Sequence, residues 1–376
     1  MNLWGVIVNR VMKLKELISL VSLKIAPLSL AENWDKVGLQ IGDVEQKITK
    51  ALVCLDLTPH VLKEAVLKKV NVIFSHHPFF FHPLEHLNKN DPQYEVLKLA
   101  LQKNISLVSL HTNLDKTFES LSDENAKKLG LHNVKPLVVD CEQYSKFVVF
   151  VPHTHVDQVR QALFSSGGGV IGDYEQCSFN TEGTGTFKGR ENSKPYLGKK
   201  EKFEEVKEIR VEVRIPRSLE KEVLSRVLKV HPYEEMAYDI YPLRNFSENT
   251  GIGRVGDLKK KISFLNFVAQ VKKQWKLKSI RVVKAKPFVQ RVALCPGSGS
   301  SLWKEALLSK ADVYITGDLK YHEVLDGSLH GLGFIEIDHF TFEKDYVSYL
   351  AKKLKHVSKI QVYEYNQAKN PFHTIH

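Results

Sequence analysis

The fold is indicated first by the stretch Asn71-Val72-Ile73-Phe74-Ser75-His76-His77-Pro78-Phe79-Phe80-Phe81. The apolar, β-prone residues 70–74 predict a buried strand, and the proline that follows cannot extend a sheet. The strand therefore presents His76 and His77 at its carboxyl end, which is where ligands bind in open α/β sheets. A lone His-His pair more often caps a strand than holds a ligand, so other residues must decide between the two interpretations.

A β-α-β unit surrounds this stretch. Residues 50–57 predict a strand, residues 60–69 a helix, and the His-His strand follows, which implies a parallel sheet. Farther on, residues 94–103 predict an amphipathic helix, and residues 106–110 predict a strand that ends in His111-Thr-Asn-Leu-Asp115. Because neighbouring parallel strands end at the same edge of a sheet, we expect His76, His77, His111 and Asp115 to lie at that edge.

A third strand, residues 333–337, ends in Asp338-His339-Phe-Thr-Phe-Glu343. His339 and Glu343 are four residues apart at the start of a predicted helix, so both lie on one face of that helix. The candidate metal ligands are therefore His76, His77, Asp115, His339 and Glu343. Mixed nitrogen and oxygen ligands suit Zn, Fe, Mn, Co or Ni rather than Ca or Mg.

Five protein ligands exceed what one tetrahedral catalytic zinc takes, whereas two divalent cations that share a bridging carboxylate could use them all. Such a pair lowers the pKa of a bridging water and supplies hydroxide at neutral pH, so hydrolysis is the chemistry that we expect. The loop of residues 31–43 adds acids and glycines that could line the mouth of a site. We expect Trp34 in this loop to be an anchor in the core.

Residues 144–245 predict a separate module. Strands are expected at residues 145–151, 175–180, 209–215 and 236–241, helices at 156–165 and 217–230, and a Gly/Thr-rich turn at 181–189. The order β-α-β-β-α-β suits a ferredoxin-like inserted domain. For its two polar clusters, His153 with His155 and residues 231–235, a surface or interface role is favoured over metal binding, because each lacks a full ligand set nearby.

The α/β pattern resumes after the module. Residues 250–256 predict a tight, glycine-rich turn at the start of this region. Residues 263–275 predict a helix, and residues 291–295 predict a strand that is followed by a turn at 296–301. That turn could hold an oxyanion on exposed amides, or it could only connect a strand to a helix with a serine cap. The predicted architecture is an α/β protein of two halves, residues 12–140 and 248–376, with parallel-rich sheets that form one metal-binding domain, plus an α+β insertion at residues 141–247.

The composition of the 376 residues is that of a globular protein, with a net charge of +11. Because the lysines are dispersed, a solvated basic surface is favoured over a nucleic-acid interface. No apolar run is long enough to span a membrane, and residues 1–11 are expected to be an extension, with Met12 a candidate start. A reducing cytoplasm is the expected compartment, because no Cys-x-x-Cys spacing occurs among the four cysteines, Cys54, Cys141, Cys177 and Cys295.

Five ordered motifs resemble the signatures of the NIF-three-like dinuclear-metal family, whose members commonly carry the name GTP cyclohydrolase 1 type 2 homolog. They are Glu32-Asn-Trp-Asp35 with Val37-Gly-Leu-Gln-Ile-Gly42, Phe74-Ser-His-His-Pro-Phe79, His111-Thr-Asn-Leu-Asp115, Thr316-Gly-Asp-Leu-Lys-Tyr-His322 and His339-Phe-Thr-Phe-Glu343.

The resemblance implies ligation of two divalent metals by the five candidate ligands, with Glu343 or Asp115 as the bridge. His111 and His322 fall in matching motifs, and the resemblance implies that they lie beside the ligands or face the substrate, where one of them would shuttle a proton. It further implies a toroidal homohexamer and a PII/CutA-like insertion.

Two classes of function remain after this comparison. The favoured one is a dinuclear metal-dependent hydrolase acting on a nucleotide-like or phosphorylated small molecule, because five ligands at strand ends exceed what a structural metal requires. The alternative is a non-catalytic protein, either a metal-binding scaffold or regulator, or a ring that binds nucleic acid through its net positive charge. No guanine-reading motif is identifiable in the sequence, so the substrate stays open.

Overall fold

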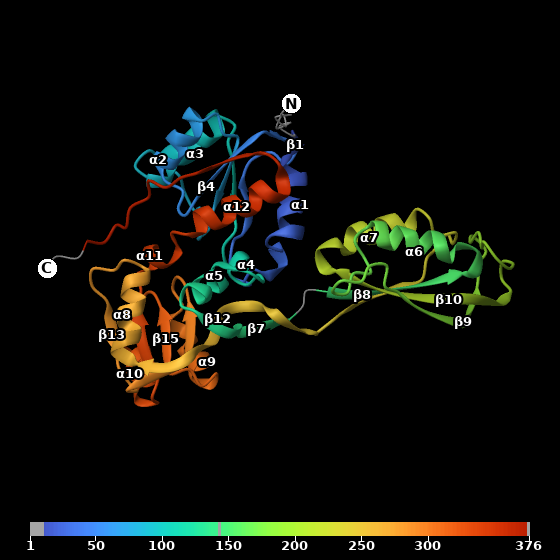
Figure 1. The fold of residues 1–376 in the computed structure, drawn as a ribbon. Coiled ribbons are helices and arrows are strands. Elements are labelled where there is room, and N and C mark those ends of the chain that lie inside the picture. The colour runs from blue at the N-terminus through green and yellow to red at the C-terminus, as the bar shows by residue number, and fades with distance from the viewer. Residues whose placement is uncertain (1–10, 142–143, 374–376) are drawn as a thin grey trace, which may run out of the picture. The chain divides into compact units, whose positions relative to one another are not determined.

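The structure, a computed structural model, describes residues 11–141 and 144–373 (Figure 1). The segment 1–10, expected to be an extension, lies outside the described residues. The chain divides into two compact units, the first combining the chain up to Asp140 with the chain from Ser247 onward, and the second running from Cys141 to Phe246.

The first unit contains a five-stranded sheet in which two sets of helices cover opposite faces. Its strand order is β17 (Gln361–Glu364), β4 (Lys50–Cys54), β5 (Val72–Ser75), β6 (Ser106–Ser109) and β2 (Gly38–Ile41), all parallel except β2. Side chains alternate across the sheet. One face packs on α1 (Leu14–Lys24) and α12 (Tyr346–Ser358), and the other on α2 (Pro59–Leu67) and α3 (Pro92–Gln102).

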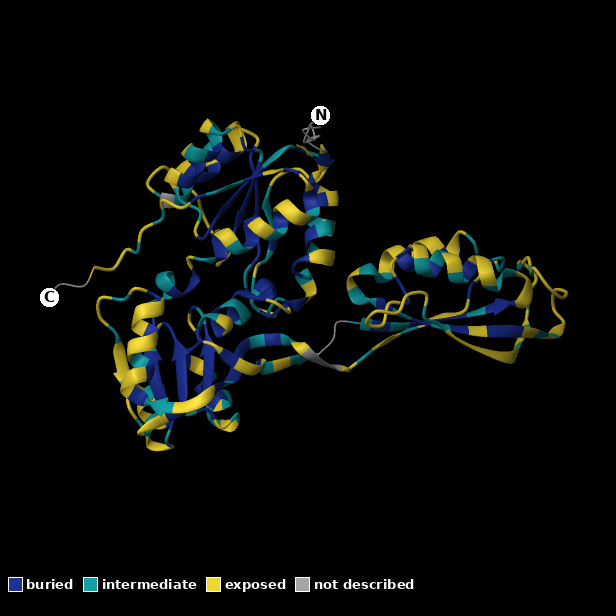
Figure 2. Ribbon diagram, viewed as in Figure 1, coloured by how far each residue is buried: buried dark blue, intermediate teal, exposed yellow. Residues whose placement is uncertain are grey.

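A six-stranded sheet completes this unit. Its order is β13 (Arg281–Val283), β16 (Gly333–Glu336), β15 (Val313–Thr316), β14 (Phe288–Cys295), β12 (Phe246–Ser263) and β7 (Leu131–Cys141). Strands β14, β15 and β16 are parallel. Helix α8 (Phe264–Gln274) packs on one face, and α9 (Trp303–Leu308) and α10 (Tyr321–Leu329) pack near the other. Figure 2 shows these sheets as buried layers whose covering helices expose their outer faces.

In each sheet, one edge strand is separated in sequence from the other strands by the insertion. Strand β7 precedes the insertion yet forms an edge of the six-stranded sheet, and β17, near the C-terminus, forms an edge of the five-stranded sheet beside β4. Helix α12, which leads to β17, packs on the five-stranded sheet together with α1. Because each sheet contains one strand from the other part of the chain, the two sheets belong to the same unit.

The second unit has the order β8 (Tyr144–Pro152), α6 (Val156–Ser165), β9 (Phe179–Lys188), β10 (Phe203–Pro216), α7 (Glu220–Leu228) and β11 (Tyr238–Pro242). Its four strands form one antiparallel sheet in the order β11-β8-β10-β9. Both helices pack on the same face, around Phe147, Val211 and Leu163. The observed element order is therefore the β-α-β-β-α-β order expected from the sequence.

Two glycine-rich stretches that the sequence indicated as turns are strands. The expected turn at 181–189 lies almost wholly in β9, where a Cβ atom at Gly185 would lie 2.1 Å from a carboxylate oxygen of Glu208. The expected turn at 250–256 lies in β12, where a Cβ atom at Gly251 would lie 2.0 Å from the carbonyl oxygen of Val138. Glycine is required there for close approach within a sheet rather than for a turn.

No helix within residues 11–141 and 144–373 is long and apolar enough to cross a membrane.

A buried arginine joins β12 to the helix that follows the first sheet. Arg254 is 1% exposed, and its guanidinium donates hydrogen bonds to both carboxylate oxygens of Asp123 at 2.7 Å, in α5 (Leu121–Lys128). It also donates to the carbonyl oxygens of Thr117, Gly251 and Gly253, each at 2.7 Å. A buried charge with this many partners fixes the strand against the helix.

Replacing Asp123 with alanine leaves the Arg254 guanidinium buried without its counter-ion. We expect Asp123→Ala to lower the free energy of unfolding by about 3–5 kcal/mol, which corresponds to a fall in melting temperature on the order of 10 °C. The control is Glu124→Ala, which removes an exposed pair with Lys127 on the same helix; there we expect a loss below about 1 kcal/mol. Equal, small losses in the two variants would contradict the role assigned to the buried pair.

Candidate metal centre

The candidate residues follow the carboxyl ends of strands in both sheets of the first unit. His76 and His77 come directly after β5, and His111 precedes the short helix α4 (Thr112–Asp115) after β6. In the other sheet, β16 leads to α11, whose first and last residues are His339 and Glu343. Asp338 caps α11 by accepting a hydrogen bond from the Thr341 amide at 2.9 Å, which fixes where the helix begins.

The Glu343 carboxylate lies at the centre of this arrangement and is 4% exposed. Its Oε2 atom is 2.9 Å from His339 Nε2 and 3.2 Å from His77 Nε2, while its Oε1 atom is 3.6 Å from His76 Nε2. His77 Nε2 and His339 Nε2 are 3.3 Å apart. The two carboxylate oxygens therefore face different imidazoles, as in a bridging ligand.

Each of the four histidines donates a hydrogen bond from Nδ1, which leaves Nε2 available. His77 donates to Asp56 and His339 to Asp318, both at 2.7 Å, and His111 donates to Asp35 at 3.0 Å. The fourth, His76, donates to the carbonyl oxygen of Leu110 at 3.0 Å. Metal-binding histidines are commonly held in this way, because an acceptor on one nitrogen fixes the tautomer and orients the other nitrogen.

His76 Nε2 is a buried atom without a hydrogen-bond partner. The His76 ring is fully buried and lies 4.3 Å from the Tyr346 ring, measured between centroids. The nearest carboxylate oxygens to Nε2 are those of Glu343 at 3.6 Å and Asp115 at 3.8 Å, which is too far for hydrogen bonds. Since a buried nitrogen without a partner is costly, this donor set fits a divalent cation between these groups.

Electrostatics couple the imidazoles to the carboxylate. Burial alone would lower the pKa of His77, but hydrogen bonds to Asp56 and Glu343 outweigh it and raise the pKa to about 10. The hydrogen bond to Glu343 raises the pKa of His339 to about 9. Burial would raise the pKa of Glu343, but the neighbouring His76, His339 and His77 hold it well below its usual range.

The structure brings most of the predicted residues together. His76, His77 and His111 form one group that could hold a metal ion, and His77, His339 and Glu343 form another, with the ligand atoms of each group within 4.8 Å of one another. Asp115 lies beside the first group.

His111, expected beside the ligands as a proton shuttle, is thus placed among the nitrogen atoms that could bind metal. His322 belongs to neither group among the described residues; it lies exposed on α10, and its ring contacts that of Tyr321. Its expected role as a proton shuttle therefore gains no support from the geometry.

Four residues of the site were not identified as such from the sequence. Asp56 and Asp318 follow the ends of strands, as the histidines do. Their position after a strand is the sequence signal that could have identified them. Gly297, in the turn of residues 296–301, has φ of +71°, and a Cβ atom there would lie 2.2 Å from Glu343 Oε1. Trp34, expected in the core, is 55% exposed, and its ring lies 6.1 Å from that of His111.

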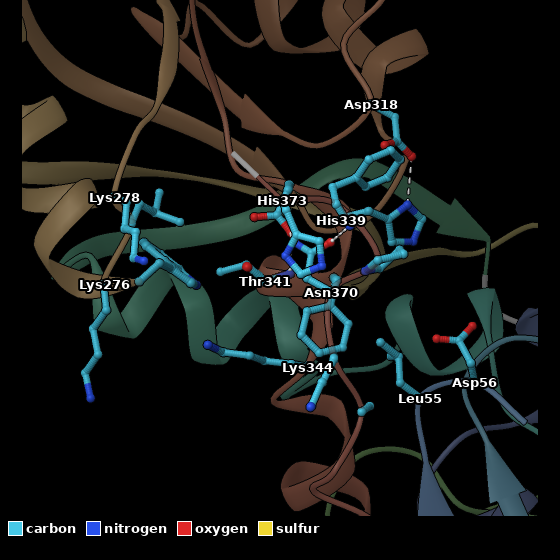
Figure 3. A pocket seen from close by; sticks show the side chains of 18 of the residues that line it. Leu55, Asp56, Lys276, Lys278, Asp318, His339, Thr341, Lys344, Asn370 and His373 are labelled. Carbon is cyan, nitrogen blue, oxygen red and sulfur yellow. Dashed lines mark hydrogen bonds and ion pairs between the residues drawn. The ribbon is translucent and has the colours of Figure 1, made fainter. Parts of the chain in front are cut away.

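A cleft of about 1360 Å³ opens beside the centre, within the first unit. His77 and His339 line it together with their partners Asp56 and Asp318. Figure 3 shows Lys276 and Lys278 at the end of this cleft away from His339 and Asp318. The site is therefore accessible to a small molecule through an opening that carries several lysines.

The fold and this geometry define the class, an α/β protein with a buried histidine-carboxylate site that could hold divalent metal. The sequence model of Duf34/NIF3 (NGG1p interacting factor 3) matches residues 12–371, and the chain belongs to this family. A relative from Halalkalibacterium halodurans, named GTP cyclohydrolase 1 type 2 homolog, is 37% identical over 351 residues, covering 93% of this chain and 94% of the relative. A Bacillus subtilis relative of the same name is 37% identical over 317 residues, covering 84% and 85% of the two chains.

Among solved structures, a Bacillus cereus protein related to NIF3 superposes with a TM-score of 0.81 at 34% identity, covering 97% of this chain and all of the other. The expected family is therefore confirmed by sequence and by fold.

Gly297 offers a test of the packing around Glu343. We expect Gly297→Ala to displace the Glu343 carboxylate and to lower the metal content per chain, measured by elemental analysis after dialysis against zinc. The control is Gly130→Ala, which has φ of +70° but nothing within 4 Å of the added carbon. Both variants carry a backbone cost of about 1–2 kcal/mol, so an equal loss of metal in both would show that backbone strain, and not contact with Glu343, is responsible.

Metal binding to the metal-free protein should release protons. With pKa values raised to about 10 and about 9, His77 and His339 hold protons at pH 7.5, and a cation needs their neutral rings. We expect release of up to about two protons per chain from these two rings, and an apparent affinity that rises with pH up to that range. Calorimetric titration with zinc in two buffers of different ionisation enthalpy measures the release. Identical enthalpies in the two buffers would contradict the assignment.

Proposed function

We propose that this protein is a metal-dependent hydrolase that acts on a nucleotide-like or phosphorylated small molecule. The observation that carries the proposal is a set of four imidazoles whose Nδ1 atoms are already hydrogen-bonded. The Nε2 atoms of three of them face Glu343, and the fourth ring, His111, forms a possible metal-binding group with His76 and His77. The unpartnered Nε2 atom of His76 supports the same interpretation, because a bound cation would satisfy it.

Six side chains would hold two divalent cations drawn from Zn, Fe, Mn, Co and Ni. The set comprises the five ligands expected from the sequence and one histidine added from its geometry: His76, His77, Asp115, His339, Glu343 and His111. We assign Glu343 as the bridge, because its two oxygens face different histidines. His111 is assigned as a ligand rather than as a proton shuttle.

Two such cations, when bound, would supply Lewis acidity and a water of lowered pKa. The residues of the chain would orient the ligands and exclude water. Asp56, Asp318 and Asp35 would hold the protons on Nδ1 of their histidines and keep the Nε2 atoms aimed at the centre. The Tyr346 hydroxyl, which donates to the Leu110 carbonyl oxygen at 3.1 Å, would support the backbone beneath His76 and exclude water from that side.

We also propose that the second unit is ferredoxin-like and related in kind to PII and CutA domains. Its element order and its strand order β11-β8-β10-β9 support this proposal. The resemblance of the sequence motifs supports assembly into a homohexamer.

Metal content of wild-type protein and of two variants tests the proposal. We expect about two metals per chain in wild type, with loss of at least one in His77→Ala and in Glu343→Gln, and with hydrolysis lost in both. The control is His356→Ala, which removes an exposed histidine of α12 outside both groups. Elemental analysis gives the metal content, and a screen of nucleotides, GTP first, and of phosphoesters gives turnover.

A wild-type chain without metal, or metal that persists in both variants, would contradict the proposed centre. Two metals per chain with no turnover of any nucleotide or phosphoester would contradict the hydrolase and leave a non-catalytic metal-binding protein.

A further inference from the structure

The cleft beside the metal centre is rich in lysine. Four lysines, here called the lysine wall, line it: Lys276, Lys278, Lys344 and Lys369. Among the residues that the structure describes, no carboxylate lies within ion-pair distance of any of these four side chains. Lysines that line one concave space raise the local concentration of anions there.

The acids of the same cleft are already engaged. Asp56 and Asp318 accept hydrogen bonds from His77 and His339. Glu336 pairs with Arg281 at 2.7 Å and also accepts from the Leu319 amide. The fourth acid, Asp338, accepts from the Thr341 amide and from the Asn370 side chain, at 2.9 and 2.7 Å. Each of these acids therefore has hydrogen-bond or ion-pair partners of its own, and none of them pairs with the lysine wall.

One member of the lysine wall is the sequence neighbour of a candidate metal ligand. Lys344 follows Glu343 directly and is the C-terminal cap of α11. Lys276 and Lys278 lie beyond the end of α8, on either side of the half-buried Leu277, and Figure 3 shows them at the far end of the pocket. Lys276 has φ of +55°, a left-handed conformation that ends α8 and turns the chain toward the cleft lining.

We propose that the lysine wall binds the polyphosphate of the substrate, so that the substrate class is a nucleoside polyphosphate or a similar molecule with several phosphate charges. This inference rests on the proposed function, because it places the anionic part of the substrate beside the reacting centre. A single phosphate would reach only part of the wall, whereas a chain of phosphates can contact lysines at both ends of the cleft. Lysine binds phosphate as a point charge, which suits a flexible polyphosphate.

The test uses the metal-loaded full-length protein and inorganic tripolyphosphate as the probe. We expect the double variant Lys276→Ala/Lys278→Ala to bind tripolyphosphate about tenfold more weakly by calorimetry, with a shallower dependence of affinity on salt. The matched control is Lys272→Ala/Lys273→Ala, which removes the same charge from exposed positions of α8 outside the cleft lining. That variant should bind within twofold of wild type. Lys344→Gln tests the end of the wall nearest the metals and should also weaken binding.

Equal affinity in wild type and the wall variants, or equal loss in the wall variants and the control, would overturn the inference. So would binding of single-stranded DNA that depends on these lysines without binding of tripolyphosphate. Metal content stays at the wild-type level in every wall variant if they act only on the anion.

The two proposals can fail separately. Wall-dependent binding of tripolyphosphate without any hydrolysis would support this inference and contradict the hydrolase. Hydrolysis whose KM is the same in wild type and the wall variants would support the hydrolase and overturn this inference.

Discussion

The Glu343 carboxylate is the group on which the site depends. It is almost fully buried, and a carboxylate in that position is stable only if positive charge or hydrogen-bond donors surround it. Three imidazoles meet it through Nε2, and each is held from behind by an acceptor on Nδ1. Without metal, protonated His77 and His339 would compensate the charge, and with metal the cations would do so instead. The same buried carboxylate thus explains the raised pKa values of His77 and His339.

The topology explains how residues from distant parts of the chain reach this carboxylate. His77 and Glu343 are 266 positions apart, and each follows a strand of a different sheet. The exchange of β7 and β17 between the two sides of the insertion joins the sheets in one unit, and the buried pair of Arg254 with Asp123 adds a polar connection between β12 and α5. The carboxyl ends of parallel strands in both sheets then contribute to one site, which follows the general rule for ligand sites in α/β proteins.

The sequence predicted the parts of this site that depend on local pattern. An apolar run that stops at His76 and His77, and the four-residue spacing of His339 and Glu343, identify ligands because each signal lies within a few residues. The roles of His111, Asp35 and Asp56 could not be read in this way, since they depend on which strand lies beside which. Trp34 was misplaced for the same reason, because an aromatic residue at a site mouth has the same local pattern as one in a core. The glycines of β9 and β12 were wrongly predicted to form turns, because close approach between strands can also require glycine.

In the proposed centre, two cations would occupy the space between the Nε2 atoms and share Glu343. Anomalous diffraction from crystals of the metal-loaded protein, collected on both sides of the absorption edge of the bound metal, tests it directly. We expect two peaks per chain, bonded by Nε2 of His76, His77, His111 and His339, with Glu343 in contact with both. A single peak, bonding through Nδ1, or peaks confined to the second unit would contradict it.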